Sequence, residues 1–217
     1  MRSDRLPRLR RWRLWFAAAT VAGVWAGCGG SPTAPSVSVT LPSEASIDGF
    51  VRSDGTAVTA GGGPGVGDLE QFVPGIGYRE FYSFNLAGIP PTATLNSATL
   101  NLFQAAVYGA AYPTHGFVVV DHVDVGTALD PGDYAGNTLT PDLGILSINP
   151  AIGYKTIDVL AAVKADLAAG RSRSQFRLRF SVLDFNNDGQ NDFAEFTDVE
   201  DSCCSVSRAP GLAIAYR

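Results

Sequence analysis

The chain has 217 residues, of which 16 are lysine or arginine, 21 are aspartate or glutamate and two are histidine, so its formal net charge is −5 at neutral pH. Nucleic-acid binding calls for a basic stripe or patch, and this acidic balance speaks against that class of partner. The length is sufficient for one domain with a substantial core.

The first 27 residues have the layout of a secretory signal. Six arginines lie within the first thirteen residues, and an apolar run follows from Leu14 to Val24. That run is shorter than the roughly 20 apolar residues that a transmembrane helix needs, and small residues follow it. We therefore predict that residues 1–27 are a signal peptide that directs export.

The end of this segment, Ala26-Gly27-Cys28, resembles a lipobox, in which the cysteine thiol receives diacylglycerol before cleavage, although Trp25 stands where an aliphatic residue is usual. The resemblance implies that Cys28 is the lipidated first residue of the mature protein. The alternative is an ordinary signal peptide that is cut nearby and leaves a free cysteine. Gly29 resembles the second residue of lipoproteins that are passed on to the outer membrane. We expect a chain that is exported and anchored by lipid to the cell envelope.

Cleavage before Cys28 would change the charge of the protein. Six of the 16 basic residues and one of the 21 acidic residues lie in residues 1–27, so 10 basic and 20 acidic residues remain and the net charge becomes −10. All three tryptophans leave with the signal, whereas all seven tyrosines remain. The mature protein is therefore strongly acidic and has no tryptophan.

Residues 28–44 are predicted to form a flexible tether after the lipidated cysteine. Gly, Ser, Pro and Thr dominate this segment, and its only β-type pattern is the short alternation SVSVT. A segment of this composition cannot bury enough apolar surface to fold by itself.

Residues 45–217 are predicted to form one all-β domain, a jelly-roll-like β-sandwich with one short helix. Short runs of alternating or β-branched residues separated by turn-rich segments are typical of sandwiches and barrels. Within the run 175–182, Phe176, Leu178 and Phe180 are expected to point inward and Arg177 and Arg179 outward. Residues 53–74 are expected to form a loop. The predicted strands are 47–51, 78–86, 98–107, 117–125, 145–148, 154–157, 175–182 and 211–216.

The predicted helix covers residues 158–170 and would lie over one end of the sandwich. Apolar residues recur at helical spacing from Val159 to Leu167. Asp158 can cap the first amides, and Gly170 can end the helix in a left-handed turn.

Three phrases in this domain resemble DNRLRE-type domains in their order along the chain. The phrases are YREFYSFNLAGIPPTATLNSATLNLFQ (78–104), TIDVLAAVKADLAAG (156–170) and FTDVEDSCCSVSRAPGLAIAY (196–216). The resemblance covers residues 45–217 and implies a jelly-roll β-sandwich related to carbohydrate-binding modules, some of which bind alginate. It supports the fold more strongly than the ligand, because one fold hosts many functions.

The sequence DFNNDGQNDFAE, residues 184–195, matches the calcium-loop pattern D-x-[DN]-x-[DN]-G-x5-E in full. Oxygen ligands at positions 1, 3, 5, 7 and 12 of such a loop suit Ca²⁺, and the glycine at position 6 allows the sharp turn. The flanks are predicted strands rather than helices, and a polar hairpin turn is the alternative, since Asn-Asp-Gly is also strong turn chemistry. The candidate calcium ligands are Asp184, Asn186, Asp188, Gln190, Asp192 and Glu195.

No sequence motif marks a nucleophile, and we expect no catalytic residues and no enzyme. His122 is expected to face solvent from its strand, and His115 to lie in a turn. The adjacent Cys203 and Cys204 can pair with each other only as a strained ring; two free thiols or bonds to another chain are the alternatives. Two adjacent thiols alone do not make a structural zinc site, which needs four ligands.

Exposed aromatic rings are the usual platform for sugars, and the candidate ligand-binding residues are Tyr108, Tyr112, Tyr134 and Tyr154, in or near predicted loops. The alternative is that these rings pack at the rim with their hydroxyls in water.

We expect a membrane-anchored, non-catalytic module that binds extracellular polysaccharide, with Ca²⁺ as a candidate cofactor. The alternative function is a structural or adhesion lipoprotein of the envelope with protein partners. An acidic domain would repel acidic glycans such as alginate unless calcium bridges them.

Overall fold

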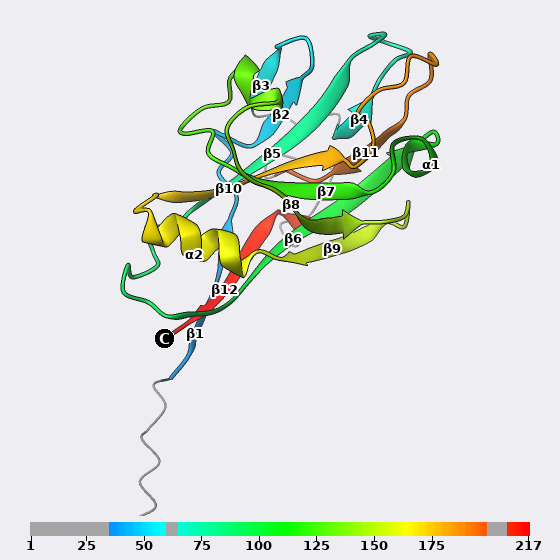
Figure 1. Ribbon diagram of the computed structural model, residues 1–217. Helices are drawn as coiled ribbons and strands as arrows, with labels where there is room; N and C mark the ends of the chain where they lie inside the picture. The colour runs from blue at the N-terminus through cyan, green and yellow to red at the C-terminus, as the bar shows by residue number, and fades with distance from the viewer. Residues whose placement is uncertain (1–34, 60–64, 199–207) are drawn as a thin grey trace, which may run out of the picture. The chain divides into compact units, whose positions relative to one another are not determined.

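The computed structural model describes residues 35–59, 65–198 and 208–217 (Figure 1). The predicted signal peptide and the residues Cys28, Cys203 and Cys204 lie outside these ranges. The described part is an all-β sandwich with short helices, which confirms the predicted fold class. None of its helices is long and apolar enough to cross a membrane.

Twelve strands, two α-helices and one 3-10 helix make up the described residues. The strands are β1 (Val37–Pro42), β2 (Gly49–Arg52), β3 (Ala57–Thr59), β4 (Val66–Asp68), β5 (Gly77–Asn85), β6 (Leu95–Tyr108), β7 (Val118–Val123), β8 (Thr138–Ser147), β9 (Gly153–Asp158), β10 (Arg173–Phe180), β11 (Phe193–Phe196) and β12 (Gly211–Tyr216). The helices are α1 (Ala111–His115), η1 (Pro131–Tyr134) and α2 (Leu160–Ala168).

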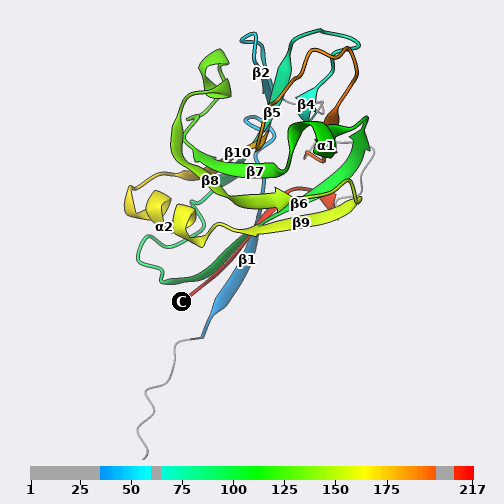
Figure 2. The same cartoon turned by 45° about the vertical axis from the view of Figure 1, so that its right-hand side comes forward.

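All strand pairs are antiparallel and belong to one sheet that folds back over itself. Its main path runs β1-β12-β6-β11-β4-β5-β10-β7-β8, while β9 pairs with β6 and β2 connects β3 to β5. Figures 1 and 2 show β5, β10 and β7 on one side and β6, β9 and β12 on the other. The short strands β4 and β11 join the two sides, because β4 pairs with β5 and β11 with β6.

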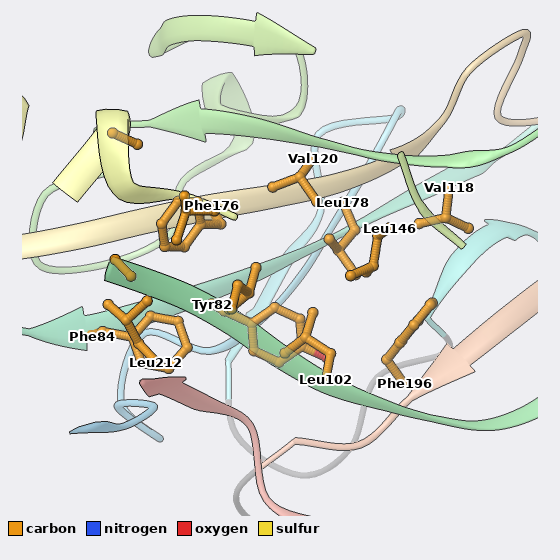
Figure 3. Close-up of a cluster of buried hydrophobic side chains, with 14 of the residues drawn as sticks. Tyr82, Phe84, Leu102, Val118, Val120, Leu146, Phe176, Leu178, Phe196 and Leu212 are labelled. Atoms are coloured by element: carbon orange, nitrogen blue, oxygen red, sulfur yellow. The ribbon is translucent and has the colours of Figure 1, made fainter. Parts of the chain in front are cut away.

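The main core lies between these two sides, where alternating residues of each strand meet (Figure 3). Phe176, Leu178 and Phe180 of β10 are buried there, as predicted from their alternation. Leu100 and Leu102 of β6 lie opposite them in the same cluster. Burial of each such side chain contributes about 1.5–3 kcal/mol to folding.

A second, smaller core covers the outer face of β5 and β7. Phe81 and Val123 pack there with Leu129 and Tyr134 from the segment that carries η1. The same segment covers Arg177, which is 3% exposed. The expectation that Arg177 points into solvent is therefore wrong: the side chain does leave the main core, but residues 124–137 bury it on the other face.

The predicted tether, residues 28–44, is wrong from Val37 onward. Residues Val37–Pro42 form β1, which pairs with β12 from Val37↔Tyr216 to Pro42↔Gly211. Val39 packs against the main core, and Glu44 forms an ion pair with Arg173 at 2.7 Å. The SVSVT alternation was the strand signal, and the sandwich includes residues that the prediction assigned to the tether.

The predicted helix is confirmed as α2, with both of its expected end signals. Oδ1 of Asp158 accepts the amide of Leu160 at 2.8 Å, and Gly170 has a φ of +69°. The expectation that His122 faces solvent is wrong, because this residue of β7 is buried against the helix. Nε2 of His122 lies 2.9 Å from both carboxylate oxygens of Asp166 on α2.

Candidate ligand-binding groove

A groove with a volume of about 490 Å³ lies where β6 ends and β11 begins. Three segments that are distant in sequence form it: the turn after β4, the start of the segment between β6 and α1, and the loop before β11. Figures 1 and 2 show α1, β4 and β11 at this end of the sandwich. Its lining residues are Gln71, Tyr108, Gly109, Ala110, Asp188, Gln190, Asn191 and Asp192.

Tyr108 provides the aromatic surface of the groove. It pairs in register with Phe193 across β6 and β11, and the two rings stack at 4.3 Å with an interplanar angle of 13°. Tyr108 nevertheless remains 46% exposed. The stacking fixes the orientation of the ring, so Tyr108 offers a rigid aromatic surface to a ligand.

Glu70 holds the loop on one side of the groove. Its Oε1 accepts the amide of Asn187 at 2.6 Å, and its Oε2 accepts the amide of Gly189 at 2.9 Å. Asn187 and Gly189 have φ values of +61° and +78°, a region that asparagine and glycine adopt more readily than other residues. A buried carboxylate therefore organises the Asn-Asp-Gly turn.

Asp192 connects the groove to the strand behind it. Its Oδ1 accepts the amide of Ala110 at 2.5 Å, and its backbone exchanges hydrogen bonds with Asp68 of β4 at 3.0 and 3.1 Å. A Cβ on Gly109 would lie 2.1 Å from Oδ1 of Asp192, and Gly109 has a φ of +58°. This corner of the groove therefore requires glycine.

A buried acid–histidine pair, Asp68 and His115, lies behind Asp192. Nε2 of His115, at the end of α1, is 3.2 Å from Oδ2 of Asp68, and both side chains are fully buried. Neither atom makes a well-aligned hydrogen bond among the described residues. Burial, with a contribution from Glu70, Asp192 and Asp188, raises the pKa of Asp68 to about 7. Burial also lowers the pKa of His115, so its imidazole is neutral at pH 7.

The six predicted calcium ligands have different partners in the structure. Asp188, Gln190 and Asp192 line the groove, whereas Asp184 is buried and its Oδ2 accepts hydrogen bonds from Arg79 at 2.7 Å and Tyr134 at 2.8 Å. Asn186 donates to Asp188 at 2.8 Å, and Glu195 lies on β11. Over the described ranges, no group of three His, Cys, Asp or Glu side chains has an arrangement that could hold a metal ion. Calcium binding by these residues stays a prediction.

The four predicted tyrosines do not form one platform. Tyr112 is 8% exposed, and its hydroxyl bonds Gln104 and Ser147, which corrects the expectation that it offers a ring to a ligand. Tyr134 is half-buried, with Arg79 4.3 Å above its ring. Tyr154 is 52% exposed and packs edge-on against Phe103 of β6. Of the four, only Tyr108 lines the groove.

Sequence reasoning did not identify Glu70 and Gln71, which lie in the segment 53–74 that was expected to be a plain loop. The backbone amide of Gln71 donates to Oδ1 of Asn191 at 3.0 Å, and its side-chain Nε2 donates to Oε1 of Gln190 at 3.2 Å. These contacts join residues about 120 positions apart, so no local pattern announces them.

The chain matches no protein-family model and no curated protein. The resemblance to DNRLRE-type domains therefore stays a prediction.

Proposed function

We propose that this protein is a membrane-anchored, non-catalytic module that binds an extracellular polysaccharide in the groove around Tyr108. The observation that carries the proposal is the rigid, half-exposed ring of Tyr108 beside amide and carboxyl side chains. An aromatic face packs against the apolar face of a sugar ring, and amides and carboxylates bond its hydroxyls.

The anchoring part of the proposal rests on the sequence. Residues 1–27 have the layout of an export signal, and Cys28 ends a segment that resembles a lipobox. A module of this kind would hold a glycan close to the envelope from which it extends.

A glycan array probed with the full mature chain in detergent tests the binding function. We expect the wild type to bind at least one class of polysaccharide, and Tyr108→Ala to lower that signal by about tenfold, the change that a loss of about 1.4 kcal/mol produces. The matched control is Tyr154→Ala, which removes a similarly exposed tyrosine from outside the groove. Repeating the array with a chelator tests the predicted role of Ca²⁺. Absence of any glycan signal, with or without Ca²⁺, would contradict the proposal.

The alternative function, a structural or adhesion lipoprotein, is favoured by one observation: among the described strands, β8 pairs only with β7, so its other edge has no strand partner there. This strand ends the main path of the sheet, and Leu139 and Ile145 on it are exposed, as is Ile148 just after it. A free strand edge with apolar side chains suits a protein partner that adds a strand. Cross-linking on intact cells that is lost in Ile145→Lys, with an empty glycan array, would support this function over sugar binding.

A further inference from the structure

The groove has negative charges in its walls. Asp188 and Asp192 line it, and Glu70 holds the loop that carries Asp188. None of the described residues that line the groove is a lysine or an arginine. A ligand in this groove therefore meets carboxylates, hydrogen-bonding amides and one aromatic ring.

Among the residues that the structure describes, no lysine or arginine forms an ion pair with the carboxylates at the groove. Within the described ranges, Asp184 is paired with Arg79, but Glu70, Asp188 and Asp192 form no ion pair with a lysine or arginine. Behind the groove, Asp68 lies beside His115, whose burial favours the neutral imidazole. Burial raises the pKa of Asp68, and the charges of Glu70, Asp192 and Asp188 add to the rise.

Tyr108 adds a second preference for positive charge. A cation within about 6 Å of an aromatic face is attracted by the ring quadrupole, and the attraction is larger where water is partly excluded. The stacked Phe193 keeps the ring of Tyr108 in place at the groove. A carboxylate and a fixed aromatic face together favour an ammonium group, whereas a uronate carboxylate would be repelled by Asp188 and Asp192.

We propose that the groove binds a glycan with free amino groups, a cationic amino sugar polymer of the glucosamine type, in preference to neutral or uronate glycans. This inference rests on the proposed sugar-binding function and names the ligand class of the same site. The ammonium groups would interact with the exposed carboxylate of Asp188 and the face of Tyr108, with the charge of the buried Asp192 behind them. The sugar hydroxyls would interact with the amides of Gln71 and Gln190.

The test compares three oligosaccharides of equal length by calorimetric titration of the full mature chain in detergent: glucosamine, N-acetylglucosamine and guluronate. We expect the glucosamine oligomer to bind at least tenfold more tightly than its N-acetylated counterpart at low ionic strength. The ratio should shrink toward one at about 1 M salt, because salt screens the charge interaction.

Asp188→Asn should lower the affinity for the glucosamine oligomer about tenfold and change that for the N-acetylated oligomer less than twofold. The matched control is Asp124→Asn, which removes the same charge from an exposed residue that does not line the groove, and it should change neither affinity. If Asp188→Asn has an altered unfolding temperature, the salt dependence of the wild type decides the question without the variant.

The outcomes separate this inference from the proposed function. Equal affinity for the free and acetylated oligomers, or tighter binding of guluronate with or without Ca²⁺, would overturn the amino-sugar preference while sugar binding stood. If no oligosaccharide bound, and the glycan array were also empty, both would fail.

Discussion

Arg177 on β10 and Asp121 on β7 form a buried ion pair across two neighbouring strands. Nη2 and Nε of Arg177 lie 2.8 and 3.1 Å from the same oxygen, Oδ2 of Asp121. Arg179 adds a bond to this oxygen at 3.0 Å, and the amide of Asp142 donates to the other oxygen at 3.0 Å. Burial alone would raise the pKa of Asp121, but these bonds outweigh it and lower the pKa.

Removing the carboxylate should destabilise the domain strongly. Asp121→Ala leaves the charge of Arg177 buried without its partner, which costs about 3–5 kcal/mol. Urea denaturation at pH 7 measures the loss. The control, Asp124→Ala, breaks an exposed pair with Arg171 and should cost less than about 1 kcal/mol. Similar losses in the two variants would mean that the buried pair contributes no more to the free energy of unfolding than the exposed pair does.

The same carboxylate should contribute to acid unfolding. Because the pKa of Asp121 is lower in the folded state than its usual 3.8, its contribution to stability is present above pH 4 and is lost as the pH falls through the folded pKa. Asp121→Asn removes this contribution, so its free energy of unfolding should fall less steeply than that of the wild type below pH 4. Parallel curves for the two proteins would contradict this assignment.

Glu80 should show the opposite pH dependence. It is buried on β5, and burial raises its pKa well above 4.5, with the charges of Asp198 and Asp48 adding to the rise. The folded state therefore keeps a proton that the unfolded chain loses, so stability falls as the pH rises above about 4.5 toward the folded pKa. Glu80→Gln should be more stable than the wild type at pH 8 and similar to it at pH 4, as measured by urea midpoints. A variant less stable at pH 8 would show that Glu80 is charged there.

The corner of the groove at Gly109 can be tested with a matched glycine. Gly109→Ala combines an unfavourable positive φ with a clash against Asp192, so it should lower both thermal stability and glycan affinity. Gly170→Ala has a similar φ of +69° but open space around the new methyl group. It should show the smaller backbone cost, about 1 kcal/mol, with unchanged glycan binding. Equal effects of the two variants on binding would mean that the corner does not shape the site.

The first strand gives a test of the domain boundary. Deleting residues 37–42 removes β1, uncovers the edge of β12 and takes Val39 and Leu41 away from the core. We expect a loss of at least about 2 kcal/mol, measured by thermal and urea unfolding. Deleting residues 29–34 instead should leave the unfolding midpoint unchanged. If both deletions were neutral, β1 would be dispensable.

Local periodicity predicted the elements that carry their own signal. The alternation in β10 and β12 and the helical spacing in α2 identify these elements without knowledge of their partners. The strand β4 has no such signal, because three residues are too few to show a period. Its position depends on pairing with distant strands: Val66 and Gly67 pair with β11, and Gly67 and Asp68 pair with β5. The burial of Arg177 was not predictable either, since it depends on how residues 124–137 return over the sheet.

The groove was predictable only in parts. Tyr108 was selected as an aromatic residue near a loop, and Asp188 and Asp192 as oxygen donors in a calcium-loop pattern. Their meeting with Gln71 follows from the pairing of β11 with both β4 and β6, which is a tertiary relationship. The sequence pattern also could not show that Asp184 forms an ion pair with Arg79, because the two residues are 105 positions apart.

The pairing of β1 with β12 has a mechanical consequence for a protein held at its N-terminus. Tension from the membrane side would enter the domain at Val37, whose partner is Tyr216. Pulling along the strand loads all six residue pairs of β1 and β12 at once, whereas pulling across it separates them one after another. The direction in which a bound glycan pulls would then decide whether the six pairs of β1 and β12 resist the force together or separate one at a time.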